Sequence, residues 1–450
     1  MSLAAKPDPA ARADAGYPAA WTAWRAVGVL LILYALSMMD RQVISLMVGD
    51  LKHDLGLSDF QISLLQGFSF ALLYAVLGLP FGMAVDRLPR RYVICFGVLL
   101  WASAATACGL AQNFPQLLLA RTLVGAGEAA LAPAAYSILS DMFPKRRLTF
   151  ALSIYTIGAT LGSEMGTVLG GLLLHLARNG VELPVLGLTP AWRFAFLATG
   201  APGLLLAFLI FLIPEPRRGL AGAAPAAHST WADVFAYIRA RWAFYACHVV
   251  GFSCVMAMAY VRMSWAPAFL MRRFDWPVDR VGMTLGTFGV VVGVATFLTT
   301  GQFVDWLMKK GVADAHFRYY LWGSIAAVVG GVGGFLAPSE PLFFVGLAIS
   351  AVPLNMAAIA ASAIQLVTPA ELRGRVSALY LLIVALFAMT VGPSMVGLLT
   401  DLVFKDPLKL HLSMASAYAV LGPIAIAAFW LGLGPMRRAV AQMDAADAKA

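Results

Sequence analysis

Twelve long apolar segments separated by short polar loops constrain this chain more than any other feature of its sequence. A helix that crosses a bilayer needs roughly 20 mainly apolar residues, and 61% of the 450 residues are hydrophobic whereas only 12% are charged. The sequence therefore predicts an all-α integral membrane protein with twelve transmembrane helices and no room for a large soluble catalytic domain. The expected spans are 25–48, 61–85, 92–112, 114–141, 148–176, 192–214, 242–270, 281–306, 317–337, 341–366, 376–400 and 412–434.

Lysine and arginine residues are unevenly divided between the two sides of this predicted bundle. Of the 32, 21 lie in the tails and loops on the side of the chain termini, and 8 lie in the opposite loops. Because cytoplasmic loops are enriched in these residues, we expect a multi-pass protein of the cell (inner) membrane with both termini in the cytoplasm. The net charge of +9 then reflects topology and contact with anionic membrane lipids, and nucleic acid is not expected as a partner.

The longest loop divides the chain into two halves of six spans. It begins with an Ala- and Pro-rich stretch and continues as WADVFAYIRARW, whose apolar residues recur at helical spacing, which predicts an amphipathic helix at the membrane surface. The expected domains are an N-terminal cytoplasmic tail (1–24), an N-terminal six-helix half (25–214), a linker with the amphipathic helix (215–241), a C-terminal six-helix half (242–434) and a C-terminal tail (435–450).

The two halves carry the same short motifs at equivalent places. A glycine, an acid and two bases follow the second and the eighth spans at identical spacing: Gly82, Asp86, Arg90 and Arg91 in the first copy, and Gly301, Asp305, Lys309 and Lys310 in the second. A proline also precedes a basic cluster after both the fourth and the tenth spans, at Pro144 and Pro369. Two parallel six-helix repeats are typical of a large class of secondary transporters whose substrate site lies between the halves.

Residues that would indicate an enzyme are missing from the sequence. The four cysteines lie singly within apolar runs, and the six histidines are scattered without the spacing of metal ligands. Neither an HExxH motif nor a nucleophile elbow is present. We therefore expect no enzymatic activity, no metal and no cofactor, and the two-half repeat argues against a channel.

Six ionisable side chains lie inside the predicted spans, where each charge costs about 2.5 to 3.5 kcal/mol on insertion scales. They are Asp40 and Arg41 in the first span, Arg121 and Glu128 in the fourth, Glu164 in the fifth and Arg262 in the seventh. Charges at this depth usually serve a substrate or proton pathway. The alternative is a structural role, in which charge pairs only hold the helices together.

The spacing of these charges suggests which of them meet. Arg121 and Glu128 are seven residues apart and therefore share one face of a helix. The first and fourth spans run in opposite directions, which places Asp40 and Arg121 at a similar depth. We expect an ion pair between Asp40 and Arg121, with Glu128 near the midplane as a separately titratable acid. Glu164 lies among glycines that recur every fourth residue from Gly158 to Gly170, a pattern that predicts close helix packing.

The motif GxxxDRxxRR, formed by Gly82, Asp86, Arg87, Arg90 and Arg91, resembles the loop signature of the major facilitator superfamily. Within that superfamily the acid-base pair of the first span, the segment QGFSFALLYAVLGLPFGMAVDR and the segment ARTLVGAGEA are similar to spinster-type lipid transporters. The resemblance implies a monomeric carrier with two pseudo-symmetric halves that works by alternating access. It also implies a conformational latch between the halves, made by the motif residues together with Asp305, in the outward-open state.

The function expected from residues and resemblance together is proton-coupled secondary active transport. Glu128 and Asp40 are the candidate proton-coupling residues, and the candidate substrate-binding residues are Arg121, Arg41, Arg262 and Glu164. Arginines can bind a phosphate or another anion, and the resemblance implies a small amphipathic substrate such as a lysophospholipid or a sphingoid phosphate. A carrier of another small molecule, such as an organic anion, a drug or a sugar, is the alternative.

Overall fold

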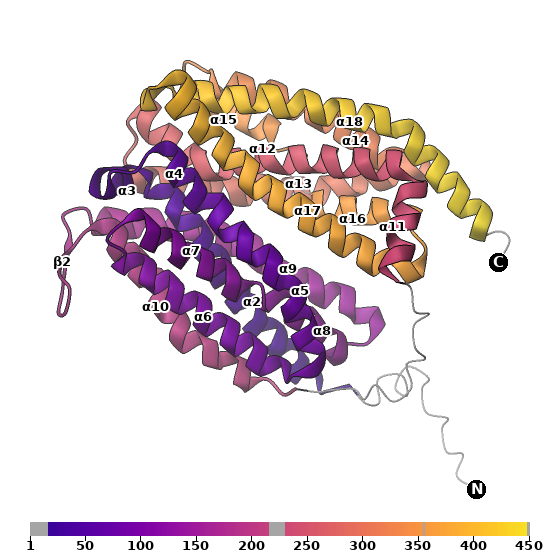
Figure 1. Ribbon diagram of the computed structural model, residues 1–450, viewed down its shortest axis with the longest axis horizontal. Coiled ribbons are helices and arrows are strands. Elements are labelled where there is room, and N and C mark those ends of the chain that lie inside the picture. The colour runs from indigo at the N-terminus through magenta and orange to yellow at the C-terminus, as the bar shows by residue number, and fades with distance from the viewer. Residues whose placement is uncertain (1–16, 216–229, 354–355, 448–450) are drawn as a thin grey trace, which may run out of the picture.

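The helices form two bundles that lie side by side, with the N-terminal half at the lower left of Figure 1 and the C-terminal half above it. The computed structural model describes residues 17–215, 230–353 and 356–447. Within these residues the chain is helical apart from short loops and one two-stranded hairpin. The prediction of a helical membrane protein built from two six-helix halves is confirmed.

Both halves consist of helices joined by short connections, some of which are 3-10 or π-helical turns, denoted η. In chain order, the N-terminal half contains α2 (Ala20–Val43), η1 (Ile44–Leu46), α3 (Val48–Leu55), α4 (Asp59–Ser63), η2 (Leu64–Phe68), α5 (Ser69–Arg87), α6 (Arg90–Leu110), α7 (Phe114–Glu128), α8 (Leu131–Met142), α9 (Lys145–Leu176), β1 (Val181–Leu183), β2 (Gly187–Thr189), α10 (Ala191–Leu206) and η3 (Ala207–Leu212). The C-terminal half contains α11 (Trp231–Ala240), α12 (Trp242–Phe274), α13 (Val278–Lys309), α14 (Ala315–Phe335), α15 (Glu340–Ser350), α16 (Met356–Val367), α17 (Ala370–Leu398), η4 (Leu399–Phe404), η5 (Pro407–Lys409) and α18 (Leu410–Asp447).

Ten helical segments of the described chain are long and apolar enough to cross a membrane. The two remaining positions in the bundle are filled by α14 and by α15 together with α16. Two details differ from the sequence expectation. The segment expected as a tail from residue 435 continues α18 as far as Asp447, and β1 and β2 form a short antiparallel hairpin before α10. Helix α11 forms where the amphipathic pattern predicted it, whereas residues 216–229 of the expected linker lie outside the described residues.

Equivalent helices in the two halves begin and pack in the same way. Pro144 and Pro369, the prolines of the sequence repeat, directly precede α9 and α17 and adopt the same extended backbone conformation. Helix α2 packs on α9 as α12 packs on α17, and α6 contacts α7 and α10 as α14 contacts α15 and α18. The repeat in sequence is therefore also a repeat in packing.

The glycine ladder of α9 brings this helix against α2; the spacing predicted close packing, and the structure supplies the partner. A β-carbon at Gly162 would lie 2.5 Å from the Cα atom of Ala35, and one at Gly166 would lie 2.8 Å from the Cα atom of Met39. Only glycine allows backbones to approach this closely. The opposite side of α9 faces α13 of the other half, where Gly171 and Gly282 meet.

The halves contact each other along two seams. One joins α9 to α13, and the other joins α4, η2 and α5 to α17. We call the end of the bundle that holds Ala20 and Asp447 the terminal end, and the end that holds Asp59 and the hairpin the distal end; in Figure 1 the distal end is on the left.

Substituting alanine for Gly162 should destabilise the N-terminal half, because the added methyl group would push α2 away from α9. Overpacking of this kind costs about 1 to 3 kcal/mol, and we expect a fall of several degrees in the thermal unfolding midpoint of the purified protein. Gly28→Ala is the matched control, because nothing lies within 4 Å of a β-carbon at Gly28. Equal midpoints for the two variants would contradict the packing argument.

Candidate functional site

An ion pair between α2 and α7 lies near the centre of the N-terminal half. The guanidinium of Arg41 contacts one carboxylate oxygen of Glu128, with Nη2 at 2.5 Å and Nε at 2.7 Å. Ser37, one turn earlier on α2, donates a hydrogen bond of 2.6 Å to the same oxygen. Glu128 is only 2% exposed, so this charge-assisted pair is shielded from water and correspondingly strong.

The expected ion pair between Asp40 and Arg121 is not formed. The buried guanidinium of Arg121 instead lies 3.4 Å from two main-chain carbonyl oxygens, those of Asp40 and Leu65. The carboxyl oxygens of Asp40 are buried and have no hydrogen-bond partner among the described residues. Glu128, which was expected to be a separate acid, is instead the partner of Arg41.

The exposed side of the Arg41 guanidinium is covered by two aromatic rings of α5. Its central carbon lies 4.0 Å from the ring centre of Phe70 and 5.1 Å from that of Tyr74, distances at which a cation is attracted to a ring face. Arg41 and Arg121 also line a cavity of about 20 Å³ between the halves, which we call the central cavity. It has room for about one water molecule.

A much larger cavity adjoins the central cavity on the terminal side. It has a volume of about 400 Å³ and lies between α5 and α17, with Trp231 of α11 in its wall. Its lining is almost entirely apolar apart from Tyr74, and Met389 lines both this cavity and the central one. We call it the α5–α17 cavity. A charged pocket and an apolar pocket therefore share a wall.

Glu164 and Arg262 line a third cavity, of about 80 Å³, between α9, α12 and α13. The carboxylate of Glu164 occupies the space beside Gly289 of α13. Gln42 and Met263 line both this cavity and the central cavity. These two candidate substrate-binding residues therefore face a cavity, although it is separate from the Arg41 and Glu128 pair.

The arginines of the loop motif make their contacts within the N-terminal half. Arg90 pairs with Asp141 at 2.6 Å, its main-chain N–H donates to Glu215, and Arg91 lies 3.4 Å from the same Glu215 carboxylate. The side chains of Arg87 and Asp305 are exposed, while that of Asp86 lies outside the described part of the structure, as does any contact it makes. The backbone of Gly82 belongs to α5. The latch between the halves stays a prediction for the opposite conformational state.

The polar contacts that join the two halves lie on the distal side of the Arg41 and Glu128 pair. Pro267 has no N–H, so it leaves the carbonyl of Met263, four residues earlier in α12, without its helical donor. The side-chain amide of Gln42 donates to this carbonyl at 3.3 Å, and that of Gln66 donates to the next carbonyl, that of Ser264, at 3.2 Å. The proline thus frees one main-chain acceptor for the N-terminal half, and Gln66 adds a bond to the neighbouring carbonyl.

A second proline inside a helix frees a carbonyl on α17, where the N-terminal half packs against it. Pro393 leaves the carbonyl of Met389 without its helical donor, and this carbonyl lies directly against Gly67 of the π-helical turn η2. A side chain at position 67 would collide with it. The indole of Trp265 in α12 donates to the carbonyl of Pro393 itself at 3.1 Å.

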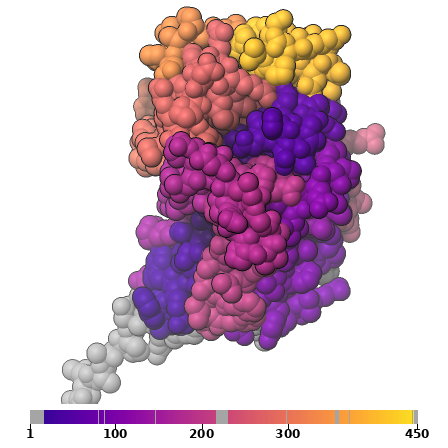
Figure 2. Space-filling model, turned by 90° about the vertical axis from the view of Figure 1, so that its left-hand side faces the viewer, coloured from indigo at the N-terminus to yellow at the C-terminus, as the bar shows by residue number. Residues whose placement is uncertain are grey.

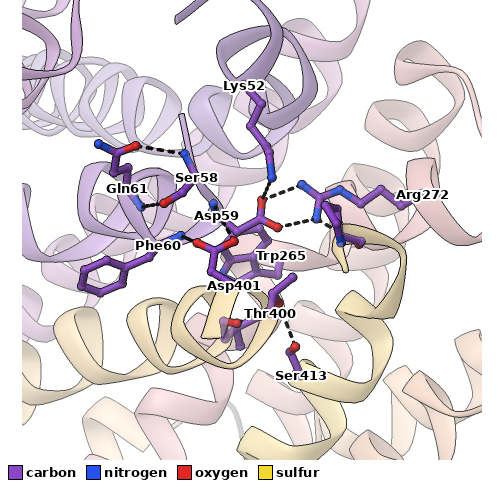
Figure 3. A network of polar contacts seen from close by, with 12 residues as sticks. Lys52, Ser58, Asp59, Phe60, Gln61, Trp265, Arg272, Thr400, Asp401 and Ser413 are labelled. Carbon is purple, nitrogen blue, oxygen red and sulfur yellow. Dashed lines mark hydrogen bonds and ion pairs between the residues drawn. The ribbon is translucent and has the colours of Figure 1, made fainter. Parts of the chain in front are cut away.

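A network of charges closes the distal end, as Figure 3 shows. The buried carboxylate of Asp59 forms an ion pair with Lys52 at 2.8 Å. It also accepts hydrogen bonds from both terminal nitrogens of Arg272 in α12, at 2.7 and 3.0 Å. Asp401 of η4 accepts hydrogen bonds from the main-chain N–H groups of Phe60 at 2.6 Å and of Asp59 at 3.3 Å. A carboxylate of the C-terminal half thereby caps the first turn of α4 in the N-terminal half.

These contacts seal the distal end of the molecule. In Figure 2, which looks at this end, the indigo atoms of the N-terminal half pack directly against the yellow atoms of the C-terminal half. Asp59, Arg272 and Asp401 were not among the residues expected from the sequence, because each lies outside an apolar span or at its edge. The available signals were the Ser58 and Gln61 capping pattern before the second span and the two prolines inside later spans.

The sequence of this chain matches a known family of proteins. The model of the Major Facilitator Superfamily matches residues 30–393. The chain belongs to the major facilitator superfamily. It is a membrane transporter, and not an enzyme, as the sequence predicted.

Relatives within the superfamily include both efflux and spinster proteins. The chain is 30% identical to an MFS-type efflux pump of Mycolicibacterium smegmatis over 92% of this chain and 94% of that protein. It is 26% identical to Protein spinster of Drosophila melanogaster over 85% of this chain, a match that spans only 62% of the fly protein. Among solved structures, a bacterial homologue of the human lysosomal transporter spinster, in an inward-facing and unoccupied conformation, superposes with a TM-score of 0.78 at 25% identity, covering 94% of this chain and 99% of that one.

A double-mutant cycle should separate the observed ion pair from the one expected from the sequence. Arg41→Ala leaves the Glu128 carboxylate buried and unpaired, so we expect Glu128→Gln to relieve much of the loss, with a coupling of about 1 kcal/mol or more. Thermal unfolding of the purified single and double variants measures it. The matched cycle with Arg121→Ala and Asp40→Asn should be close to additive. The reverse ranking of the two cycles would refute the assignment.

Asp59→Asn should open the distal end, because it weakens the contact of Arg272 across the seam. A single cysteine at Ser45, which lines the central cavity, in a background without native cysteines reports this opening. A membrane-impermeant thiol reagent applied from the distal side should label it several times faster. Asp54→Asn is the control, since Asp54 contacts Trp192 and Arg193 of its own half. Equal labelling rates for the two variants would show that Asp59 does not hold the distal end closed.

Proposed function

We propose that this transporter carries a single-chain amphipathic anion and couples its movement to protons. The observation that carries the proposal is the shared wall between the central cavity, which holds Arg41 and Arg121, and the apolar α5–α17 cavity. An anionic head and an apolar tail need these two environments next to each other, and the central cavity, which here has room for about one water molecule, would widen to take the head as the halves rock apart. A lysophospholipid or a sphingoid phosphate has this form.

The Arg41 and Glu128 pair supplies a route for proton coupling. While Glu128 is ionised, its carboxylate occupies the guanidinium of Arg41. A proton on Glu128 weakens that pair and leaves the guanidinium available to a phosphate or carboxylate of the substrate. Proton and anion then bind together, each favouring the other, which favours symport. Asp40, whose carboxyl oxygens have no partner among the described residues, is the second candidate for proton exchange.

The tail of the substrate is proposed to lie in the α5–α17 cavity. The residues that line it from α17 include Leu379, Leu382 and Leu386, and those from α5 include Ala71 and Gly78. Small residues on one wall and large apolar ones on the other leave a slot of about 400 Å³. Met389 and Tyr74 would lie where the tail meets the head.

Alternating access would occur by rocking of the two halves about the central site. The closed distal seam corresponds to the state in which the substrate reaches the site from the terminal end, which we assign to the cytoplasm from the excess of lysine and arginine there. In the opposite state the distal contacts of Asp59 and Asp401 would part. The loop motif with Asp86 and its counterpart Asp305 would then form the latch, in a carrier that acts as a monomer.

Export of apolar drugs is a second candidate, favoured by the 30% identity to the mycobacterial efflux pump over nearly the full length of both proteins. A drug would use the apolar cavity without needing an anion site. The two functions differ in their dependence on Arg41, which only the anionic substrate requires.

Transport into proteoliposomes tests the proposal. We expect saturable uptake of a lysophospholipid or a sphingoid phosphate that increases with an imposed pH gradient, and little uptake of a hexose. Glu128→Gln should abolish the response to the gradient while the protein still inserts and folds. Glu340→Gln is the control, because Glu340 lies at the distal end and pairs with Arg280. Uptake of a drug but of no lipid would overturn the lipid assignment. A gradient response that survives Glu128→Gln would overturn the coupling assignment.

A further inference from the structure

A polar cavity at the terminal end of the C-terminal half belongs to none of the sites above. It has a volume of about 130 Å³ and lies where α11 ends, α12 begins and the last turns of α18 pass by; Figure 1 shows these elements together at the right. Arg241 and Arg438 line it from opposite sides, with Gln442 one turn beyond Arg438. Two cations and an amide therefore face one small space.

The basic groups of this cavity have no acid to neutralise them within the described structure. Neither Arg241 nor Arg438 forms an ion pair with a described residue, and the buried Nε atom of Arg241 has no hydrogen-bond partner there. The guanidinium of Arg241 is held over the ring of Tyr237 at 4.1 Å. Helix α11 ends at Ala240 and α12 begins at Trp242, so helix ends of opposite polarity meet here and the positive charge of the cavity comes from its two arginines. The cavity is therefore shaped to receive an anion.

An apolar groove continues from this cavity along α12 and α17. Its volume is about 320 Å³, and Trp242 lines both the groove and the polar cavity. Ile238 of α11 closes its terminal end, and its walls include Val250 and Ile383, which are 42% and 40% exposed on the outer surface of the bundle. The groove opens sideways between transmembrane helices toward the lipid, and Leu379 of α17 separates it from the α5–α17 cavity.

We propose that the cavity and the groove together bind an anionic phospholipid of the surrounding leaflet. The phosphate of the headgroup would occupy the cavity between Arg241 and Arg438, and one acyl chain would lie in the groove beyond Trp242. Basic pockets at the end of membrane helices bind headgroups in this manner. A free phosphate would satisfy the cavity but would leave the groove without a function, which favours a lipid.

Such a lipid would fasten α11 to the C-terminal half. Helix α11 is already tied there by Tyr237, whose hydroxyl donates to the carbonyl of Val367 at 2.6 Å. The same helix contributes Trp231 to the α5–α17 cavity. Occupancy of the lipid site would therefore hold the wall of that cavity in place.

Lipid binding to the purified, full-length protein tests this site without relying on transport. Native mass spectrometry would compare phosphatidylglycerol with phosphatidylcholine of the same acyl chains, and with glycerol phosphate as the free anion. We expect tighter binding of phosphatidylglycerol, weakened roughly fivefold by each of Arg241→Gln and Arg438→Gln. Arg239→Gln, an exposed change on the same helix, should leave binding unchanged. Thermal unfolding in detergent shows that each variant is folded.

A substitution in the groove distinguishes a lipid from a free anion. Ile383→Trp fills the groove and should weaken phosphatidylglycerol binding without changing the binding of glycerol phosphate. Equal binding of the two phospholipids would overturn the proposal, as would binding that survives loss of both arginines. Glycerol phosphate bound as tightly as phosphatidylglycerol would show a free-anion site instead.

Discussion

The closed seam between the halves depends on main-chain carbonyls that two prolines leave without a partner. In a bilayer every such group needs a donor, because no water is available to supply one. Pro267 frees the carbonyl of Met263, to which the side-chain amide of Gln42 donates, and Pro393 frees that of Met389, which packs against Gly67. An uncompensated carbonyl at this depth costs several kcal/mol. The opposite state of the transporter, in which Gln42 moves away, must satisfy the Met263 carbonyl in another way, with water from an opened cavity as the available donor.

The π-helical turn η2 connects this seam to the charged site. Three successive residues of this turn face three different partners: the carbonyl of Leu65 accepts from Arg121, the amide of Gln66 donates to α12, and Gly67 lies against α17. A regular α-helix advances about 100° per residue, and the extra residue of a π turn changes which side chains face each neighbour. A displacement of α12 or α17 therefore reaches the Arg121 guanidinium through one turn of helix. The turn η2 is thus the structural connection through which substrate binding would be coupled to the rocking of the two halves.

Much of the fold follows from the sequence because lipid imposes simple rules on it. The lengths of the apolar segments predicted the spans, the repeated motif predicted the two halves, and the glycine ladder predicted close packing of α9, although not that its partner is α2. The distal network was missed for a reason that is equally physical. Asp59, Arg272 and Asp401 come from segments far apart in the sequence, and nothing in the local pattern of any one of them indicates the other two. The prolines at 267 and 393 were visible, but what binds a freed carbonyl depends on the tertiary structure.

At the central site Glu128 pairs with Arg41, whereas an ion pair between Asp40 and Arg121 was expected. Residue spacing alone could not predict this pairing. Depth in the membrane follows from counting residues along a helix, and by depth alone Asp40 and Arg121 are well matched. Rotation about the helix axis decides the pairing instead, since Asp40 and Arg41 differ by about 100°. Helix α2 presents Ala35 and Met39 to the glycines of α9, and Arg41 is two residues, or about 200°, beyond Met39. This rotation about the helix axis points Arg41 away from α9 and toward Glu128 of α7. The glycines that predict close packing would thus have fixed the rotation of α2 as well, had the sequence revealed which helix they contact.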